Sequence, residues 1–138
     1  IVSTNGNEDC HVILRGGNQP NHDVASVEGA CKALAAAGLA QRLMIDFSHG
    51  NSRKDYRRQI EVGADVAAQL AAGEERITGV MIESHLVAGR QDLVADRELV
   101  YGQSITDACL GWDETAPLLQ SLAEAVRARR LAKQEAAE

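Results

Sequence analysis

The sequence predicts an α/β protein in which parallel strands alternate with helices. Three short apolar runs, at residues 11–14, 43–47 and 77–82, are each followed by a stretch with helical periodicity. Each run ends at a polar residue, and these residues, Arg15, His49 and Glu83, lie 34 positions apart. That spacing is the length of one β-α unit. We therefore expect the strands to lie side by side in a parallel sheet, connected by helical crossovers.

The composition is typical of a globular chain of about one domain. The 138 residues are 45% hydrophobic and 25% charged, with a formal net charge of −6. This balance argues against nucleic acid or a membrane surface as a partner, because both require clustered Lys and Arg. No apolar run reaches the length of a spanning helix, and the three cysteines have no CxxC spacing, so we expect a cytoplasmic protein with reduced thiols. Because the sequence starts with Ile1 instead of Met, we interpret it as a piece of a longer protein.

The first unit begins with the strand at residues 11–14. Arg15 follows the strand, and Gly16 and Gly17 allow a ligand or another backbone segment to come close. The helix after them has an apolar stripe at Val24, Val27, Cys31 and Leu34. Taken alone, an Arg beside a loop more commonly forms a surface ion pair, so this alternative stays open for Arg15.

The second unit has its strand at residues 43–47. Strand alternation places His49 on the face of Ile45 and Phe47 and opposite Asp46 and Ser48. Asn51 or Ser52 is expected to cap the next helix. The apolar stripe of that helix is expected at Tyr56, Ile60, Gly63, Ala64, Ala67, Leu70 and Ala71. Its charged face is expected to be solvated and to comprise Arg53, Lys54, Arg57, Arg58 and Asp65.

The third unit contains the strand at residues 77–82, with Glu83 at its end. Residues 87–111 are predicted to form a loop that is longer than usual and therefore functional, with Asp107 in its polar part. The last helix starts near Trp112, and residues 127–138 form a charged tail that is either a helical extension or disordered. We therefore divide the chain into three β/α units, residues 1–126, and the tail.

The carboxyl ends of parallel strands are where such folds form their sites. His49 and Glu83 on neighbouring strands, with Asp107 from the following loop, offer the nitrogen and oxygen donors of a divalent metal site. The spacing alone leaves an ordinary hydrogen-bonded polar network equally open.

Four motifs in chain order resemble the C-terminal part of type I 3-deoxy-D-arabino-heptulosonate 7-phosphate (DAHP) synthases. They are Leu14-Arg15-Gly16-Gly17, Asp46-Phe47-Ser48-His49, Glu83-Ser84-His85-Leu86 and residues 104–112, Ser-Ile-Thr-Asp-Ala-Cys-Leu-Gly-Trp. The resemblance implies a partial TIM (β/α)8 barrel, in which this chain supplies strands six to eight with their helices. It also implies condensation of phosphoenolpyruvate with erythrose 4-phosphate, the entry step of the shikimate pathway to aromatic amino acids.

The same resemblance assigns roles to residues. His49, Glu83 and Asp107 would bind a divalent ion, Mn, Fe, Co or Zn, that polarises the aldehyde oxygen of erythrose 4-phosphate. Arg15 would bind phosphoenolpyruvate, because its planar fork matches phosphate or carboxylate oxygens. Arg15 and His49 are thus the expected catalytic residues, and Arg15, His49 and Asp107 the expected substrate contacts. The fourth metal ligand of the family, a Cys, lies outside this sequence, and Cys109 is interpreted as a small buried residue.

Two interpretations of the whole chain remain open. In the first it is part of a homo-oligomeric synthase, and it is inactive without the N-terminal half of the barrel. In the second it is a stand-alone α/β module that binds a metal or another ligand without catalysis. Three strands cannot close a barrel, so Ile13, Ile45, Phe47 and Met81 are expected to face an interior that lacks partners. We therefore expect the isolated chain to self-associate or to stay loosely packed.

Overall fold

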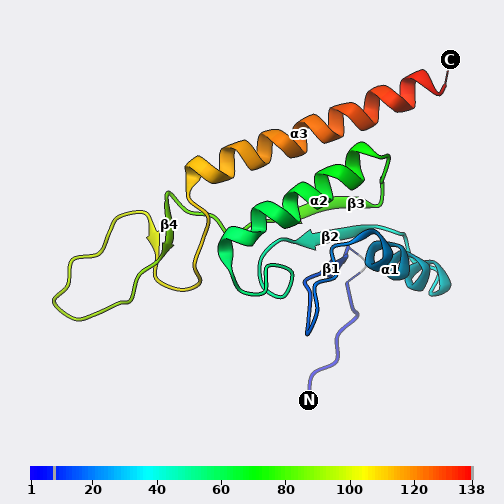
Figure 1. Ribbon diagram of the computed structural model, residues 1–138. Helices are drawn as coiled ribbons and strands as arrows, with labels where there is room; N and C mark the ends of the chain where they lie inside the picture. Colours follow the sequence, from blue (N-terminus) through cyan, green and yellow to red (C-terminus); the bar gives the residue numbers. More distant parts are fainter. Residues whose placement is uncertain (8, 138) are drawn as a thin grey trace.

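The computed structural model describes residues 1–7 and 9–137. Its elements are β1 (Val12–Leu14), α1 (Val24–Ala36), β2 (Leu43–Asp46), η1 (Tyr56–Arg58), α2 (Gln59–Ala71), β3 (Ile77–Met81), β4 (Val87–Arg90), β5 (Gln103–Ser104) and α3 (Trp112–Glu135). The predicted alternation of strands and helices is confirmed (Figure 1). Within the described residues, no helix combines the length and the apolar character that crossing a membrane requires.

β1, β2 and β3 form one parallel sheet in that order. Leu14 pairs with Ile45, and Ile45 pairs with Val80 on the other side. Neighbouring strands can be parallel only if the chain crosses back between them, and α1 and α2 are these crossovers. The carboxyl ends of all three strands therefore lie at one edge of the sheet, as the spacing of the polar residues predicts.

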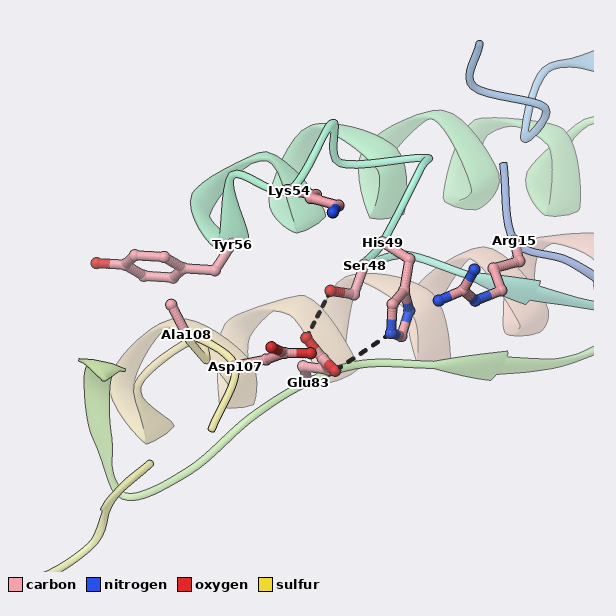
Figure 2. Close-up of a pocket in the computed structure, with 8 residues that line it drawn as sticks. All are labelled: Arg15, Ser48, His49, Lys54, Tyr56, Glu83, Asp107 and Ala108. Atoms are coloured by element: carbon pink, nitrogen blue, oxygen red, sulfur yellow. Dashed lines mark hydrogen bonds and ion pairs between the residues drawn. The ribbon is translucent and has the colours of Figure 1, made fainter. Parts of the chain in front are cut away.

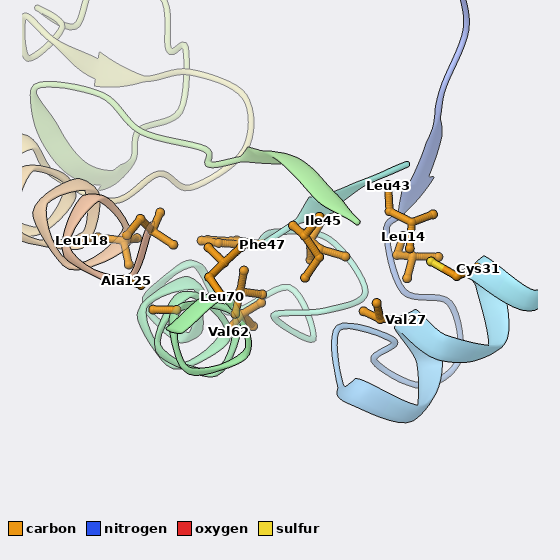
Figure 3. Packing of buried hydrophobic residues seen from close by; sticks show 14 of the residues in the cluster. Leu14, Val27, Cys31, Leu43, Ile45, Phe47, Val62, Leu70, Leu118 and Ala125 are labelled. Carbon is orange, nitrogen blue, oxygen red and sulfur yellow. The ribbon is translucent and has the colours of Figure 1, made fainter. Parts of the chain in front are cut away.

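The core lies between one face of this sheet and the helices (Figure 3). Ile45 and Phe47 have no exposed surface, and each contributes about 1.5–3 kcal/mol by burial. The strands meet α1 at Val27 and Cys31, as predicted. α3 packs along α2 and adds the buried side chains Leu118, Leu122 and Ala125.

The predicted sheet faces were wrong for Ile45 and Phe47. Both side chains point into the helix-covered core, so they cannot line the opposite face of the sheet. Ile13 does lie on that opposite face and is 47% exposed. Met44 pairs with Ile13, and its side chain lies where a side chain at Gly79 would be, so Met44 is on the same face as Ile13. In β2, therefore, Met44 faces away from the helices and Ile45 faces them, the reverse of the prediction.

The start of the second helix also differs from the prediction. Asn51 and Ser52 are both buried and do not cap a helix. Instead, Asp55 caps η1 by accepting a hydrogen bond from the backbone N–H of Arg57, and α2 begins only at Gln59. The buried stripe of α2 consequently runs through Gln59, Val62, Gly63, Val66, Ala67, Gln69 and Leu70. The expected stripe residues Ile60, Ala64 and Ala71 are exposed.

The predicted long loop contains regular structure. β4 and β5 pair in parallel within it, and single bridges join Ser84 to Leu110 and Gly89 to Cys109. These contacts fold the segment back toward the carboxyl end of β3. After it, α3 continues through Glu135, where Lys133 forms an ion pair with Glu75 at 2.6 Å.

Candidate metal centre

A cavity of about 270 Å³ opens at the carboxyl ends of β1, β2 and β3 (Figure 2). It contains the four residues that the sequence singles out, which come from four separate segments of the chain. The cavity is lined by Arg15, Ser48, His49, Lys54, Tyr56, Glu83, Asp107 and Ala108. The fold therefore brings together Arg15 and Asp107, which are 92 positions apart in the sequence.

His49, Glu83 and Asp107 form a compact group of possible metal ligands. One donor atom from each lies within 4.8 Å of the donors of the other two, and Nε2 of His49 is 3.6 Å from Oε1 of Glu83. Two ligands of one ion, each about 2.0–2.2 Å from it, are about 3–3.6 Å apart. One imidazole nitrogen and two carboxylates suit divalent first-row metals. The residues present thus fit such an ion.

The imidazole of His49 is held by a buried carboxylate. Nδ1 of His49 lies 2.7 Å from Oδ2 of Asp46, which is only 2% exposed. Oδ1 of the same carboxylate accepts a hydrogen bond from the backbone N–H of Ser48 at 2.8 Å. A carboxylate can only accept, so Nδ1 carries the proton and Nε2 turns its lone pair toward the cavity. Asp46 is therefore a positioning residue for His49.

This contact corrects the prediction that His49 and Asp46 lie on opposite faces. The backbone of His49 has φ 46°, in the left-handed region, so strand alternation ends before this residue. The resulting turn brings the imidazole back over the end of β2. Sequence periodicity does not contain this information, because alternation applies only while the backbone stays extended.

Glu83 is fixed from two sides. The hydroxyl of Ser48 donates to Oε2 of Glu83 at 2.7 Å. The buried amide of Gln59 accepts from the backbone N–H of Glu83 at 2.8 Å and donates to its carbonyl at 3.1 Å. Sequence reasoning missed Gln59, although its spacing with the buried Val62 and Val66 places it on the core-facing side of α2.

Asp107 reaches the cavity because the segment after it pairs with the end of β3. The backbone N–H of Leu110 donates to the carbonyl of Glu83 at 3.0 Å, and the N–H of His85 donates to the carbonyl of Leu110 at 2.9 Å. Cys109 in this segment is half-buried, less than predicted. Burial raises the pKa of its thiol, the charges of Glu83 and Asp107 act in the same direction, and a hydrogen bond with Ser104 opposes them. Among the described residues, the group of possible metal ligands comprises His49, Glu83 and Asp107 and does not include Cys109.

The loop after β1 at residues 15–17 (the Arg15 loop) is in direct contact with the turn at residues 49–54 (the His49 turn). The side-chain amide of Asn51, 1% exposed, donates to the carbonyls of Leu14 and Asp46 at 3.1 and 2.7 Å. Gly16 packs against the backbone of Gly50, where a Cβ on either residue would come within 3.0 Å of the other segment. These contacts fix the position of Arg15 relative to the metal-ligand group.

Lys54 is the second cation of the cavity. The sequence predicts it on a solvated helix face. Lys54 is exposed, as predicted, but it belongs to the turn before η1 and lies at the edge of the cavity (Figure 2). The turn is set by a hydrogen bond of 2.9 Å from the N–H of Lys54 to the carbonyl of His49. Tyr56, expected on the apolar stripe, also lines the cavity.

Comparison with known proteins places these residues in a family. Residues 1–120 match the DAHP synthetase I family. The chain belongs to this family. The resemblance seen in the four sequence motifs is thereby confirmed.

Two relatives and one solved structure show how far the similarity extends. The chain is 55% identical over 130 residues to the Phe-sensitive phospho-2-dehydro-3-deoxyheptonate aldolase of Escherichia coli K12, covering 94% of this chain and 37% of that protein. It is 52% identical over 136 residues to the tyrosine-inhibited enzyme of Schizosaccharomyces pombe, covering 94% and 36%. The structure of the aldolase from Francisella tularensis matches with a TM-score of 0.85 and 48% identity, over 91% of this chain and 37% of that one. The chain thus spans little more than a third of the length of these relatives.

Proposed function

We propose that this chain forms strands six to eight of a (β/α)8 barrel, with their helices, in a DAHP synthase that condenses phosphoenolpyruvate with erythrose 4-phosphate. The observation that carries the proposal is the grouping of Arg15, His49, Glu83 and Asp107 around one cavity at the carboxyl ends of adjacent parallel strands. Membership in the DAHP synthetase I family supports the same reaction. In a TIM barrel this end of the strands carries the active site.

Three residues of the cavity would bind the metal, and two more orient them. His49, Glu83 and Asp107 would hold a divalent ion, Mn, Fe, Co or Zn, which when bound supplies Lewis-acid polarisation of the aldehyde of erythrose 4-phosphate. Asp46 and Ser48 orient His49 and Glu83 through the hydrogen bonds of 2.7 Å described above. His49 and Asp107 also contact this substrate in the proposed site.

Arg15 would bind the other substrate. Its guanidinium offers two parallel N–H donors to a phosphate or carboxylate of phosphoenolpyruvate. Among the described residues, no carboxylate lies within ion-pair distance of Arg15, so its donors are available. This favours a role in binding over the surface ion pair that the sequence left open.

The rest of the barrel would cover the sheet face on which Ile13 lies. We propose that the isolated chain is inactive and self-associates, that the parent enzyme is a cytoplasmic homo-oligomer, and that residues 127–138 extend beyond the three β/α units of residues 1–126. The exposed Ile13 and the half-buried Met44 support a missing cover, because parallel sheets occur almost only with both faces covered.

An activity assay of the full-length protein that carries this chain tests the proposal. Phosphoenolpyruvate consumption should require erythrose 4-phosphate, stop after chelation and return when a divalent metal is added. His49→Ala should remove most of the turnover, whereas His11→Ala, at an exposed residue before β1, should not. Metal binding without any turnover, together with a compact monomeric isolated chain in sedimentation, would favour the stand-alone module instead.

A further inference from the structure

We infer that Lys54 is a substrate-binding residue that holds an anionic group, phosphate or carboxylate, inside the cavity. The inference rests on the proposed function for the identity of the substrates. Phosphoenolpyruvate carries a phosphate and a carboxylate, and erythrose 4-phosphate carries a phosphate. Arg15 can neutralise only one of these groups, and Lys54 is the other Lys or Arg among the described residues that line the cavity.

The position of Lys54 differs from that of the other lysines. The chain has three, and Lys32 and Lys133 form ion pairs with Glu28 at 3.3 Å and Glu75 at 2.6 Å. Among the residues that the structure describes, no carboxylate oxygen lies within 4.0 Å of the Lys54 ammonium. Its charge is therefore available to a ligand that enters the cavity.

The direction of the Lys54 side chain is set by an unusual backbone. Lys54 and its neighbour Arg53 have φ 62° and 53°, a region that L-residues with long side chains adopt rarely. The turn is fixed by the bond from the Lys54 N–H to the carbonyl of His49, which also accepts from the hydroxyl of the buried Ser52 at 3.2 Å. Residues kept in such conformations concentrate at functional sites, where the strain serves to place a side chain.

The two cations reach the cavity from different segments of the chain, Arg15 from the end of β1 and Lys54 from the turn before η1. Figure 2 shows Lys54 on the turn above Ser48, and the Arg15 guanidinium beside His49, on the side away from Glu83 and Asp107. An ammonium acts as a point charge that suits phosphate oxygens without demanding one orientation. A substrate in this cavity would thus meet a second positive charge besides that of Arg15.

Steady-state kinetics of Lys54→Gln in the full-length protein tests this role, with Arg53→Gln as the matched control. Arg53 is also exposed and also has a left-handed backbone conformation, but it does not line this cavity. We expect the KM of one substrate to rise about 10- to 100-fold, the loss expected for one charge-assisted hydrogen bond, with a smaller change in kcat. The substrate whose KM rises identifies the anion that is bound. Lys54→Arg should recover part of the loss.

A binding measurement separates this inference from the proposed function. Calorimetric titration with phosphoenolpyruvate, and with inorganic phosphate, needs no turnover. Weaker binding by Lys54→Gln than by Arg53→Gln supports the inference even if the protein shows no synthase activity. Unchanged KM values for both substrates in an active enzyme, or equal phosphate binding by the wild type and Lys54→Gln in an inactive one, would overturn it.

Discussion

Gly16→Ala should move the Arg15 loop away from the His49 turn and so displace Arg15 from the metal-ligand group. A Cβ at this position would lie 2.5 Å from the carbonyl carbon of Gly50 and 2.6 Å from the backbone N of Asn51. Ordinary contact begins near 3.4 Å, so the Arg15 loop and the His49 turn must move apart by 0.9 Å. Backbone atoms cannot swing away as a flexible side chain would.

The cost falls on both stability and activity. Gly16 has φ 75°, and an L-residue in this region costs about 1–2 kcal/mol, to which overpacking adds about 1–3 kcal/mol. A displacement near 1 Å between groups that must act together reduces the rate by about 100-fold. We therefore expect the full-length variant to lose about 100-fold in kcat/KM in the proposed reaction and to melt at a lower temperature.

The control is Gly17→Ala in the same loop, where a Cβ would meet no atom within 4 Å and φ is outside the left-handed region. It should leave the melting temperature almost unchanged. The kinetics are measured well below the melting transition, so that unfolded protein does not lower the rate. Wild-type kcat/KM in Gly16→Ala would show that the Arg15 to His49 spacing does not govern activity, and the reasoning would be wrong.

Three further predictions concern single residues. Asp46→Asn should weaken metal binding about 10- to 100-fold, because His49 loses the acceptor that fixes its orientation. Titration of the chelator-treated protein with metal measures this affinity, and an unchanged affinity would contradict the prediction. Gly29→Ala in α1 meets open space and should raise the free energy of unfolding by about 0.5–1 kcal/mol in urea denaturation, whereas a loss would mean that α1 is not helical there. The hydrogen bonds from Arg76 hold the pKa of Glu74 below its usual value. The pair therefore stabilises the fold at a pH above the unfolded-state pKa of Glu74, and this stabilisation is lost as the pH falls below that value. Arg76→Met should make the melting temperature less dependent on pH in this acid range.

Much of the fold is predictable because its signals are local. The apolar runs that end at Arg15, His49 and Glu83 identify the strands, and their equal spacing identifies the β-α unit. Parallel pairing then requires the carboxyl ends of the strands to lie at one edge of the sheet, so the sequence alone assigns these three distant residues to one site. Asp107 could be added because its motif follows the third strand.

The contacts that orient these residues could not be predicted in the same way. Asp46 reaches His49 only because the chain leaves the extended conformation at His49, and nothing in an alternating pattern marks that point. Gln59 is not predictable as a core residue, because polar residues on helices are usually exposed. In the structure its side-chain amide hydrogen-bonds both the backbone N–H and the backbone carbonyl of Glu83. Both are buried polar groups whose role depends on backbone geometry that the sequence pattern does not contain.

The candidate site and the uncovered sheet face are parts of one surface. Asp46 pairs with Met81, and Met44 with Ile13 and Gly79, so strand alternation puts these residues on the face away from the helices. The cavity lies at the carboxyl end of that same face. A segment that covers Ile13 and Met44 would therefore also form a wall of the cavity next to Arg15 and His49. Burying the face would limit the access of water to the two carboxylates and two cations, and electrostatic interactions strengthen as water is excluded. Completion of the sheet and completion of the site are thus expected to occur together.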